Sequence, residues 1–405
     1  MLMPVPDAGV IARRESIVAR LRAVIGAGTV IDDPVEARAY ECDALSAYRC
    51  PPLAVALPTT TEEVAAVLRV CHEERVPVVP RGAGTSLAGG AIPQEDAVVI
   101  GVSRMSRILE VDYDNRTATV QAGATNLSIS DRVAADGFFY APDPSSQLAC
   151  TIAGNIAMNS GGAHCLKYGV TTNNLLGARL VLMDGTIIEL GGKALDAPGL
   201  DLLGLLCGSE GQIGIITEAT VRLLARPEGA RPVLFGFDSS EVAGACVSEI
   251  IGSGIIPVAI EFMDKPAIEI CEAFAKAGYP LDVEALLIVE VEGAEGEIAE
   301  IGRGAIREDV AAADDVADAV IGVVLVAVGG DLALTLVDEI TPDEAAVMLT
   351  ERHGPTYRKV GGRVLYALRD LEAWSAIGTR KSTSDKNTGT VFAARPLTPQ
   401  ERDEL

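Results

Sequence analysis

The stretch Pro80-Arg81-Gly82-Ala83-Gly84-Thr85-Ser86-Leu87-Ala88-Gly89-Gly90 decides the fold. It stands between two β-branched runs, residues 76–79 and 97–102, which predict buried strands. Glycines let successive backbone N–H groups turn toward one anion, and the Thr and Ser hydroxyls add further donors. The loop therefore predicts a diphosphate-binding site.

Better-known phosphate loops have different spacings. A Walker A loop needs Lys and Ser or Thr at its end, whereas Gly89 is followed here by Gly90 and Ala91. A Rossmann fingerprint needs a third glycine where this chain has Leu87. A tight turn between strands that binds nothing remains the alternative.

Two further segments combine small residues with Asn and Ser. The first comprises APDPSS at 141–146, TIAGN at 151–155 and SGGAHCLKYG at 160–169, and the second is GSEGQIGIIT at 208–217. Bare backbone can lie flat against a planar ligand while Asn and Ser bond to its edge. The pattern favours a site for a ring system over a glycine-rich loop packed on its own protein.

The periodicity around these segments predicts mixed helices and strands. Thr60 is expected to cap a helix, with Glu63 reaching back to the Thr60 amide. The remaining predicted elements are a hairpin at 108–111 and 117–120, two strands about the turn at 184–185, helices at 241–252 and 265–278, and strands at 258–263 and 285–292. This alternation predicts a domain boundary near residues 227–232 and a small α+β unit beyond it.

Composition excludes several classes of protein. The 405 residues contain 57 Asp+Glu against 33 Lys+Arg, a net charge of −24 that opposes nucleic-acid binding. The eight cysteines contain no C-x-x-C pair, so structural zinc and iron–sulfur clusters are not expected, and reduced thiols are. With neither a signal-like start nor an apolar run of membrane-spanning length, we expect a soluble, cytoplasmic protein.

The quoted segments together resemble a known protein family. PRGAGTSLAGGA, APDPSSQ, TIAGNIAMNSGG, HCLKYG and GSEGQIGIIT resemble, in the same order over residues 51–226, the FAD-linked oxidases of the p-cresol methylhydroxylase/vanillyl-alcohol oxidase fold. Within that family the likeness is greatest to the D-type subunits of glycolate oxidases and to D-2-hydroxyacid dehydrogenases. The resemblance implies an α+β fold in which a two-lobed FAD-binding domain precedes an incomplete α+β cap. The expected domains are an N-terminal helical segment (1–50), the FAD-binding domain (51–230), the partial cap (231–300) and a divergent region (301–405).

The resemblance also implies which residues bind FAD. The diphosphate would lie on residues 81–86, and the isoalloxazine near Gly161 and His164, under the cap. The expected cofactor-binding residues are Pro80, Arg81, Gly82, Ala83, Gly84, Thr85, Ser86, Gly89, Pro142, Asp143, Thr151, Gly154, Asn155, Ser160, Gly161, Gly162, His164, Tyr168, Gly169, Gly211, Ile215 and Ile216. In such enzymes the C2 hydrogen of a 2-hydroxy acid leaves as hydride to flavin N5, while a base takes the hydroxyl proton.

The resemblance also implies partners that accept electrons from the flavin. Since this chain has no iron–sulfur motif, electrons are expected to pass to a partner subunit, a quinone or another acceptor. In the family the partners are a second FAD subunit and an iron–sulfur subunit, which could hold the chain at the inner membrane periphery.

The histidines mark where the chain departs from this family. Relatives carry an H-x-G-D-G-N-x-H stretch and an E-H-G stretch that hold a metal and help to remove the proton. This chain has three histidines, His72, His164 and His353, and none lies in such a context. We therefore expect no metal site and assign no catalytic base, and interpret the chain from about residue 302 as lost or replaced. A non-catalytic FAD-binding companion subunit and, more remotely, an NADPH-dependent reductase of cell-wall enolpyruvyl sugars remain alternatives.

Overall fold

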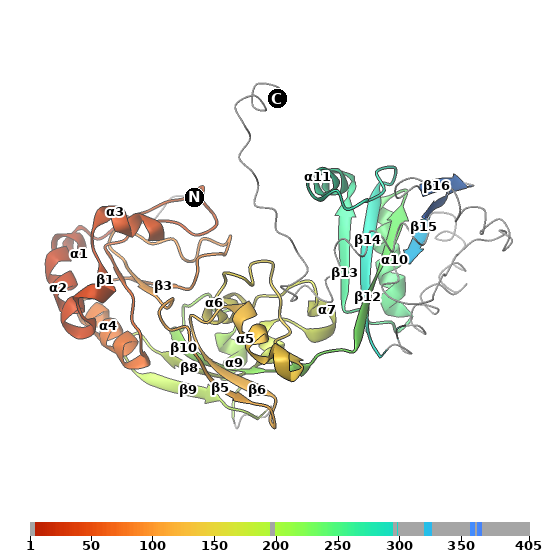
Figure 1. Ribbon diagram of the computed structural model, residues 1–405. Coiled ribbons are helices and arrows are strands. Elements are labelled where there is room, and N and C mark those ends of the chain that lie inside the picture. The colour runs from red at the N-terminus through yellow and green to blue at the C-terminus, as the bar shows by residue number, and fades with distance from the viewer. Residues whose placement is uncertain are drawn as a thin grey trace, which may run out of the picture. The chain divides into compact units, whose positions relative to one another are not determined.

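The computed structural model describes residues 5–194, 199–294 and 298, together with the backbone of 320–325, 357–360 and 363–366. Its internal contacts divide the chain into two units, residues 1–226 and 227–405 (Figure 1). The three predicted ligand-binding segments all lie in the first unit.

A four-stranded sheet in the first unit carries the loop at 82–86. Its strands are β1 (Val30–Ile31), β2 (Ala54–Ala56), β3 (Val78–Arg81) and β4 (Val98–Gly101), in the order β1-β2-β4-β3. Strands β2, β4 and β3 are parallel, while β1 is antiparallel to β2, so the sheet joins chain from both sides of residue 51. Both predicted β-branched runs are strands, as expected, and the second is fully buried.

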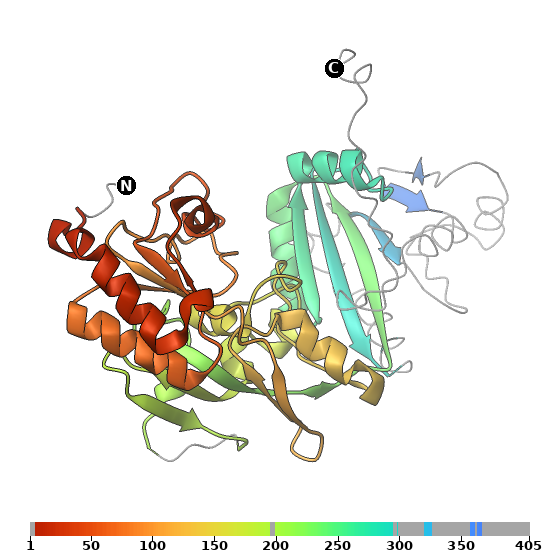
Figure 2. The ribbon, with the colours of Figure 1, turned by 60° about the vertical axis from the view of Figure 1, so that its left-hand side comes forward.

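Helices α2 and α4 lie side by side in this unit (Figure 2). The N-terminal helices and turns are α1 (Ala8–Ala12), α2 (Arg14–Ile25), η1 (Ala27–Thr29), α3 (Pro34–Ala37), η2 (Arg38–Tyr40) and α4 (Thr61–Glu74). Thr60 caps α4 as predicted, its hydroxyl accepting a 3.2 Å bond from the Glu63 N–H. The predicted return contact is wrong by one residue, because Glu63 Oε2 accepts from the Thr59 N–H (2.6 Å) and hydroxyl (2.9 Å).

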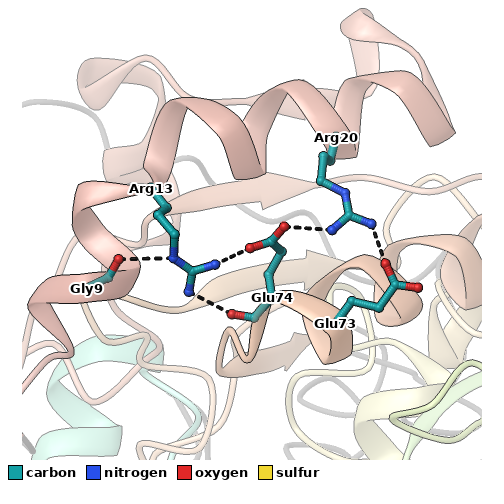
Figure 3. Close-up of polar contacts among 5 residues, drawn as sticks. All are labelled: Gly9, Arg13, Arg20, Glu73 and Glu74. Atoms are coloured by element: carbon teal, nitrogen blue, oxygen red, sulfur yellow. Dashed lines mark hydrogen bonds and ion pairs between the residues drawn. The ribbon is translucent and has the colours of Figure 1, made fainter.

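Arg13, which directly precedes α2, and Arg20 within it attach α2 to the end of α4 (Figure 3). Arg13 pairs with the Glu74 carboxylate and donates a 2.9 Å bond to the Glu74 carbonyl. Arg20 bridges Glu73 and Glu74, with Nη1 2.6 Å from Glu74 Oε1. Because these arginines are exposed, solvent screens the ion pairs, and the clearest structural gain is the capped carbonyl at the helix end.

A second, five-stranded antiparallel sheet completes the first unit. Its strands are β5 (Ile108–Asp112), β6 (Thr117–Gln121), β8 (Leu175–Val181), β9 (Ile187–Gly191) and β10 (Ile215–Arg222), in the order β5-β6-β10-β8-β9. The hairpin β5–β6 and the pair β8–β9 confirm the predictions. The smaller elements are α5 (Asn126–Val133), η3 (Ala134–Asp136), β7 (Phe138–Phe139), α6 (Ile152–Met158), α7 (Cys165–Tyr168), α8 (Thr171–Asn174), α9 (Leu202–Leu206) and β11 (Leu224–Ala225).

One apolar core connects the two sheets of this unit. It contains Leu68 of α4, Ile100 of β4, Ile129 of α5 and Leu180 of β8, all nearly inaccessible to solvent. Since core packing is tight, the relative positions of the loops that leave these elements are fixed by this core.

The second unit is built on another antiparallel sheet. Its strands are β12 (Gly229–Phe237), β13 (Ala259–Asp264), β14 (Ala285–Gly293) and β15 (Val320–Leu325), in the order β13-β14-β12-β15. Phe237 and Leu287 pack with α10 (Ser240–Gly252), whereas Leu286 packs with α11 (Lys265–Ala275). Neighbouring residues of a strand point to opposite faces, so each helix covers a different face. The predicted elements are confirmed, although α11 ends before residue 278.

The divergent region predicted from about residue 302 lies almost wholly outside the described residues. Within it the structure gives the backbone of β15 and of a hairpin, β16 (Tyr357–Val360) and β17 (Arg363–Tyr366). His353 also lies outside the described residues. Over the described part of the chain, no helix combines the length and apolar character needed to cross a bilayer.

Candidate FAD-binding site

The three predicted segments meet around one cavity of about 310 Å³ in the first unit. This volume falls within the range of small-molecule sites, about 300–1,000 Å³. Predicted residues on its wall are Pro80, Arg81, Gly82, Ala83, Gly84, Thr85, Ser86, Thr151, Gly154, Asn155, Ser160, Gly211, Ile215 and Ile216. The structure thus brings together segments separated by more than a hundred positions in the sequence.

Strand β3 delivers the first segment and ends on Arg81, whose side chain is 9% exposed. Gly82 and Gly84 follow, and neither has room for a side chain. A Cβ on Gly82 would lie 2.3 Å from Thr151 Oγ1, and one on Gly84 would lie 2.4 Å from Arg81 Nη2. The glycines are therefore required by close packing, and they place bare backbone on the wall of the cavity.

The second segment enters the cavity through helix α6. Thr151 caps this helix, accepting a 3.3 Å bond from the Gly154 N–H. Asn155 on the same helix is buried and its Oδ1 accepts a 3.1 Å bond from Asn126, while its amide nitrogen lies 3.3 Å from Cys150 Sγ. A satisfied buried polar network of this kind holds a wall rigid.

The third segment borders the cavity beside Pro80. Gly211, with φ +79°, places its Cα so close to Pro80 that a Cβ would be 3.1 Å from the proline ring. Gly214 packs against the Val181 carbonyl, which a Cβ would approach to 2.7 Å. Strand β10 then begins at Ile215, and its first residues supply apolar wall.

The other predicted residues lie outside the cavity wall. They are Gly89, Pro142, Asp143, Gly161, Gly162, His164, Tyr168 and Gly169. Asp143 and His164 form a buried pair: Asp143 Oδ2 lies 2.6 Å from His164 Nδ1, and Oδ1 accepts a 3.3 Å bond from the His164 N–H. Gly162 fits beneath this pair, since a Cβ there would lie 2.3 Å from the Asp143 carbonyl. Contact of these eight residues with the cofactor remains a prediction.

Several wall residues were not predicted. They are Gly90, Ala91, Val102, Ser146, Cys150, Ala153, Ala157, Met158, Glu210 and Gly214. Helical spacing offered a signal for Ala157 and Met158, which lie three and four positions after Gly154 on α6. Glu210 has φ +53°, a conformation that is uncommon outside glycine and that no sequence pattern indicated.

The donors and the apolar wall of the cavity fit FAD. A diphosphate needs several N–H and O–H donors and a cation, which the backbone of 82–86, two hydroxyls and Arg81 provide. Isoalloxazine and adenine need flat contact with bare backbone and apolar groups, which α6 and β10 provide. Among the described residues, no three or more His, Cys, Asp or Glu side chains form a cluster suited to a metal ion.

Comparison with known proteins points to the same cofactor. The profile of the family described as "FAD binding domain" matches residues 52–191, and that of "FAD linked oxidases, C-terminal domain" matches residues 226–327. The chain is 50% identical over 287 residues to the glycolate oxidase subunit GlcD of Escherichia coli K12, covering 71% of this chain and 58% of that one. It is 42% identical over 219 residues to a D-lactate dehydrogenase of Archaeoglobus fulgidus, covering 54% and 49%.

The chain therefore spans less than two thirds of the length of either relative. Among solved structures it resembles p-cresol methylhydroxylase with substrate bound, with a TM-score of 0.65 over 79% of this chain and 67% of that one. At 17% identity this likeness shows the fold alone. The predicted fold class, resemblance and cofactor are confirmed: the chain carries an FAD-binding domain and a C-terminal domain of FAD linked oxidases, in a fold like that of p-cresol methylhydroxylase.

Proposed function

We propose that the chain binds FAD in this cavity and uses it to oxidise a small 2-hydroxy acid such as glycolate or D-lactate. The observation that carries the proposal is the buried Arg81 at the start of a loop of bare backbone, on the wall of a cavity that also collects the Asn- and Ser-bearing segments. The names of the similar proteins, a glycolate oxidase subunit and a D-lactate dehydrogenase, support the substrate class.

Within this proposal each segment has a part. Residues 81–86 hold the diphosphate, and the backbone of α6 and the start of β10 line the rings. The isoalloxazine lies near Gly161 and His164, where the Asp143–His164 pair stiffens the loop. Asp143 and His164 are buried and in short contact, which supports a structural role for the pair in holding the loop beside the cofactor.

FAD, when bound, supplies the acceptor for a hydride from C2 of the acid. The chain's own residues have to hold the carboxylate, orient C2 and receive the hydroxyl proton. The family's H-x-G-D-G-N-x-H stretch, which serves that last purpose elsewhere, is absent from the sequence. We therefore assign no residue of this chain as the base.

That absence favours a second candidate function. The chain would then be a non-catalytic FAD-binding subunit of a glycolate oxidase complex, retaining the cofactor site without turnover. For both candidate functions, the similar protein from Escherichia coli is named a subunit of glycolate oxidase, and this name supports a multi-subunit complex for the present chain. We propose a second FAD subunit and an iron–sulfur subunit as partners, with a quinone as an alternative acceptor.

Anaerobic flavin spectroscopy separates the two candidates. The purified chain is reconstituted with FAD and mixed with glycolate, D-lactate or, as a control, L-lactate. Loss of the flavin's visible absorbance with glycolate or D-lactate supports the dehydrogenase. A yellow protein unchanged by either acid supports the binding subunit, and a chain that takes up no FAD overturns both.

A further inference from the structure

The side chain of Arg81 is held by residues upstream of the matched FAD-binding domain, which begins at residue 52. Its Nη1 donates a 2.7 Å bond to the Cys42 carbonyl and a longer, 3.4 Å bond to the Ala91 carbonyl. Both acceptors are neutral main-chain groups. The guanidinium is therefore fixed in position without being neutralised.

An aromatic ring supports the guanidinium as well. Arg81 Cζ lies 5.6 Å from the centre of the Tyr40 ring, within the range of a cation–π contact. The ring itself packs on an apolar cluster that includes Val55, Leu57 and Val99. These residues belong to or adjoin the β1-β2-β4-β3 sheet. The sheet therefore holds the Tyr40 ring in place, and the ring restricts the position of the guanidinium.

The diphosphate loop lies directly on this arrangement. Gly84 has φ +71°, and its missing Cβ would stand 2.4 Å from Arg81 Nη2 and 2.7 Å from Cζ. On the other side of the loop, the Ala44 N–H donates a 3.1 Å bond to the Ser86 carbonyl. Residues 40–45 and the loop at 82–86 are thus joined at both ends of the loop.

The charge of Arg81 has no direct counter-ion in the described part of the chain. No described carboxylate lies within the 4.0 Å of an ion pair, and the nearby Asp43 uses Oδ1 to accept a 2.9 Å bond from the Leu45 N–H. Burial lowers the pKa of Arg81, although a guanidinium stays protonated near neutral pH. The direct partners of this buried cation are neutral carbonyls and a ring, so an anion in the adjoining cavity would add the charge pairing that they do not supply.

We infer that Tyr40 and the backbone of residues 42–44 form an unassigned support behind the diphosphate loop, outside the cavity wall, and that Tyr40 is a positioning residue that acts through Arg81. The inference rests on the proposed FAD binding in this cavity. The ligand that this support serves is the diphosphate of a dinucleotide, not the flavin or the adenine ring. Loss of the Tyr40 ring would release the guanidinium and, with it, the loop.

The test compares Tyr40→Leu with Tyr40→Phe, which keeps the ring and loses only a hydroxyl. Each variant and the wild type are titrated with FAD, with ADP, which has the diphosphate but no flavin, and with riboflavin, which has the flavin but no phosphate. In Tyr40→Leu, FAD and ADP should bind about tenfold more weakly and riboflavin with unchanged affinity, because a partly buried cation–π contact contributes on that scale. Tyr40→Phe should bind all three like the wild type.

A second variant and a second readout keep the inference testable if Tyr40→Leu does not fold. Arg81→Lys keeps the charge but loses the planar fork, and should weaken FAD and ADP at least as much as Tyr40→Leu. In the wild type, ADP should slow hydrogen exchange at the Ala44 amide, and in Tyr40→Leu this protection should be lost. Circular dichroism shows whether each variant is folded.

Each outcome decides something. If Tyr40→Leu, once shown to be folded, binds FAD and ADP like the wild type, or loses riboflavin equally, the positioning role is wrong. If Tyr40→Leu does not fold, unchanged ADP affinity in Arg81→Lys overturns the inference in the same way. A wild type that binds ADP but not FAD leaves the support by residues 40–44 standing and overturns the proposed function, whereas a wild type that binds neither overturns both.

Discussion

The hydroxyl oxygen of Thr151 occupies the space that a side chain on Gly82 would need: a Cβ there would lie 2.3 Å from Oγ1. The same oxygen caps α6 by accepting from the Gly154 N–H. One contact therefore joins the loop after β3 to the helix that carries the second segment of the cavity.

Gly82→Ala should weaken FAD binding by tenfold or more, because the new methyl group displaces either the loop or the cap. Loss of the cap alone would cost about 1 kcal/mol of stability. Fluorescence titration with FAD measures the affinity and denaturant unfolding measures the stability. Gly28→Ala is the matched control, since a Cβ at Gly28 meets nothing within 4 Å.

A double-mutant cycle identifies the cause. If the clash with Oγ1 is responsible, Gly82→Ala combined with Thr151→Ala should bind FAD no more weakly than Thr151→Ala alone. Additive losses in the double variant would show that Gly82 matters for a different reason.

Gly162→Ala tests the part of the predicted site that lies outside the cavity wall. A Cβ there would stand 2.3 Å from the carbonyl and from Oδ1 of Asp143, so the Asp143–His164 pair has to move. We expect a shifted flavin spectrum and weaker FAD binding. Gly192→Ala, with nothing within 4 Å of the new carbon, should behave like the wild type. An unchanged spectrum in Gly162→Ala would remove this loop from the isoalloxazine site.

The second unit offers a matched pair of phenylalanines. Phe237 is fully buried between β12 and α10, whereas Phe274 on α11 is 90% exposed. Phe237→Ala should destabilise the protein by about 3–5 kcal/mol through the cavity it leaves, and Phe274→Ala by less than about 0.5 kcal/mol. Denaturant unfolding monitored by the labelling of buried Cys246 compares the two. Equal costs would show that the described packing of this unit is wrong.

Buried Cys71 gives the first unit a pH dependence with a definite sign. Burial raises the pKa of Cys71 from its ordinary 9.0 to about 12. Between these values the unfolded thiol loses its proton while the folded one keeps it, so this contribution to stability is complete below pH 9 and is lost as the pH rises toward 12. Cys71→Ala should therefore flatten the fall in stability above pH 9. An identical slope in the wild type and the variant would contradict the burial of this thiol.

Local patterns were enough to predict most elements, because each one reports a short-range preference. The run at 97–102 is apolar without interruption and forms a buried strand, and Thr60 precedes a helical period and caps α4. The glycine-rich loop at 82–86 and the segments at 151–160 and 211–216 were predicted as a site from their residue types, and the fold brings them together.

What the sequence concealed are contacts that leave no pattern. The Cys42 carbonyl bonds to Arg81 through main-chain atoms, which any residue could supply, and Tyr40 stacks on that guanidinium from a distant position in the chain. Glu63 reaches Thr59 instead of Thr60, a choice set by side-chain reach within one turn. Such details depend on three-dimensional proximity and not on periodicity.

Titration of the cofactor-free chain with FAD tests most directly whether the cavity between residues 80–86, 151–160 and 211–216 is the FAD site. We predict saturable quenching of flavin fluorescence with one FAD per chain in the wild type and in Gly28→Ala, and strongly weakened binding in Gly82→Ala. Binding of equal affinity in Gly82→Ala and the wild type, or no saturable binding in the wild type, would contradict this assignment.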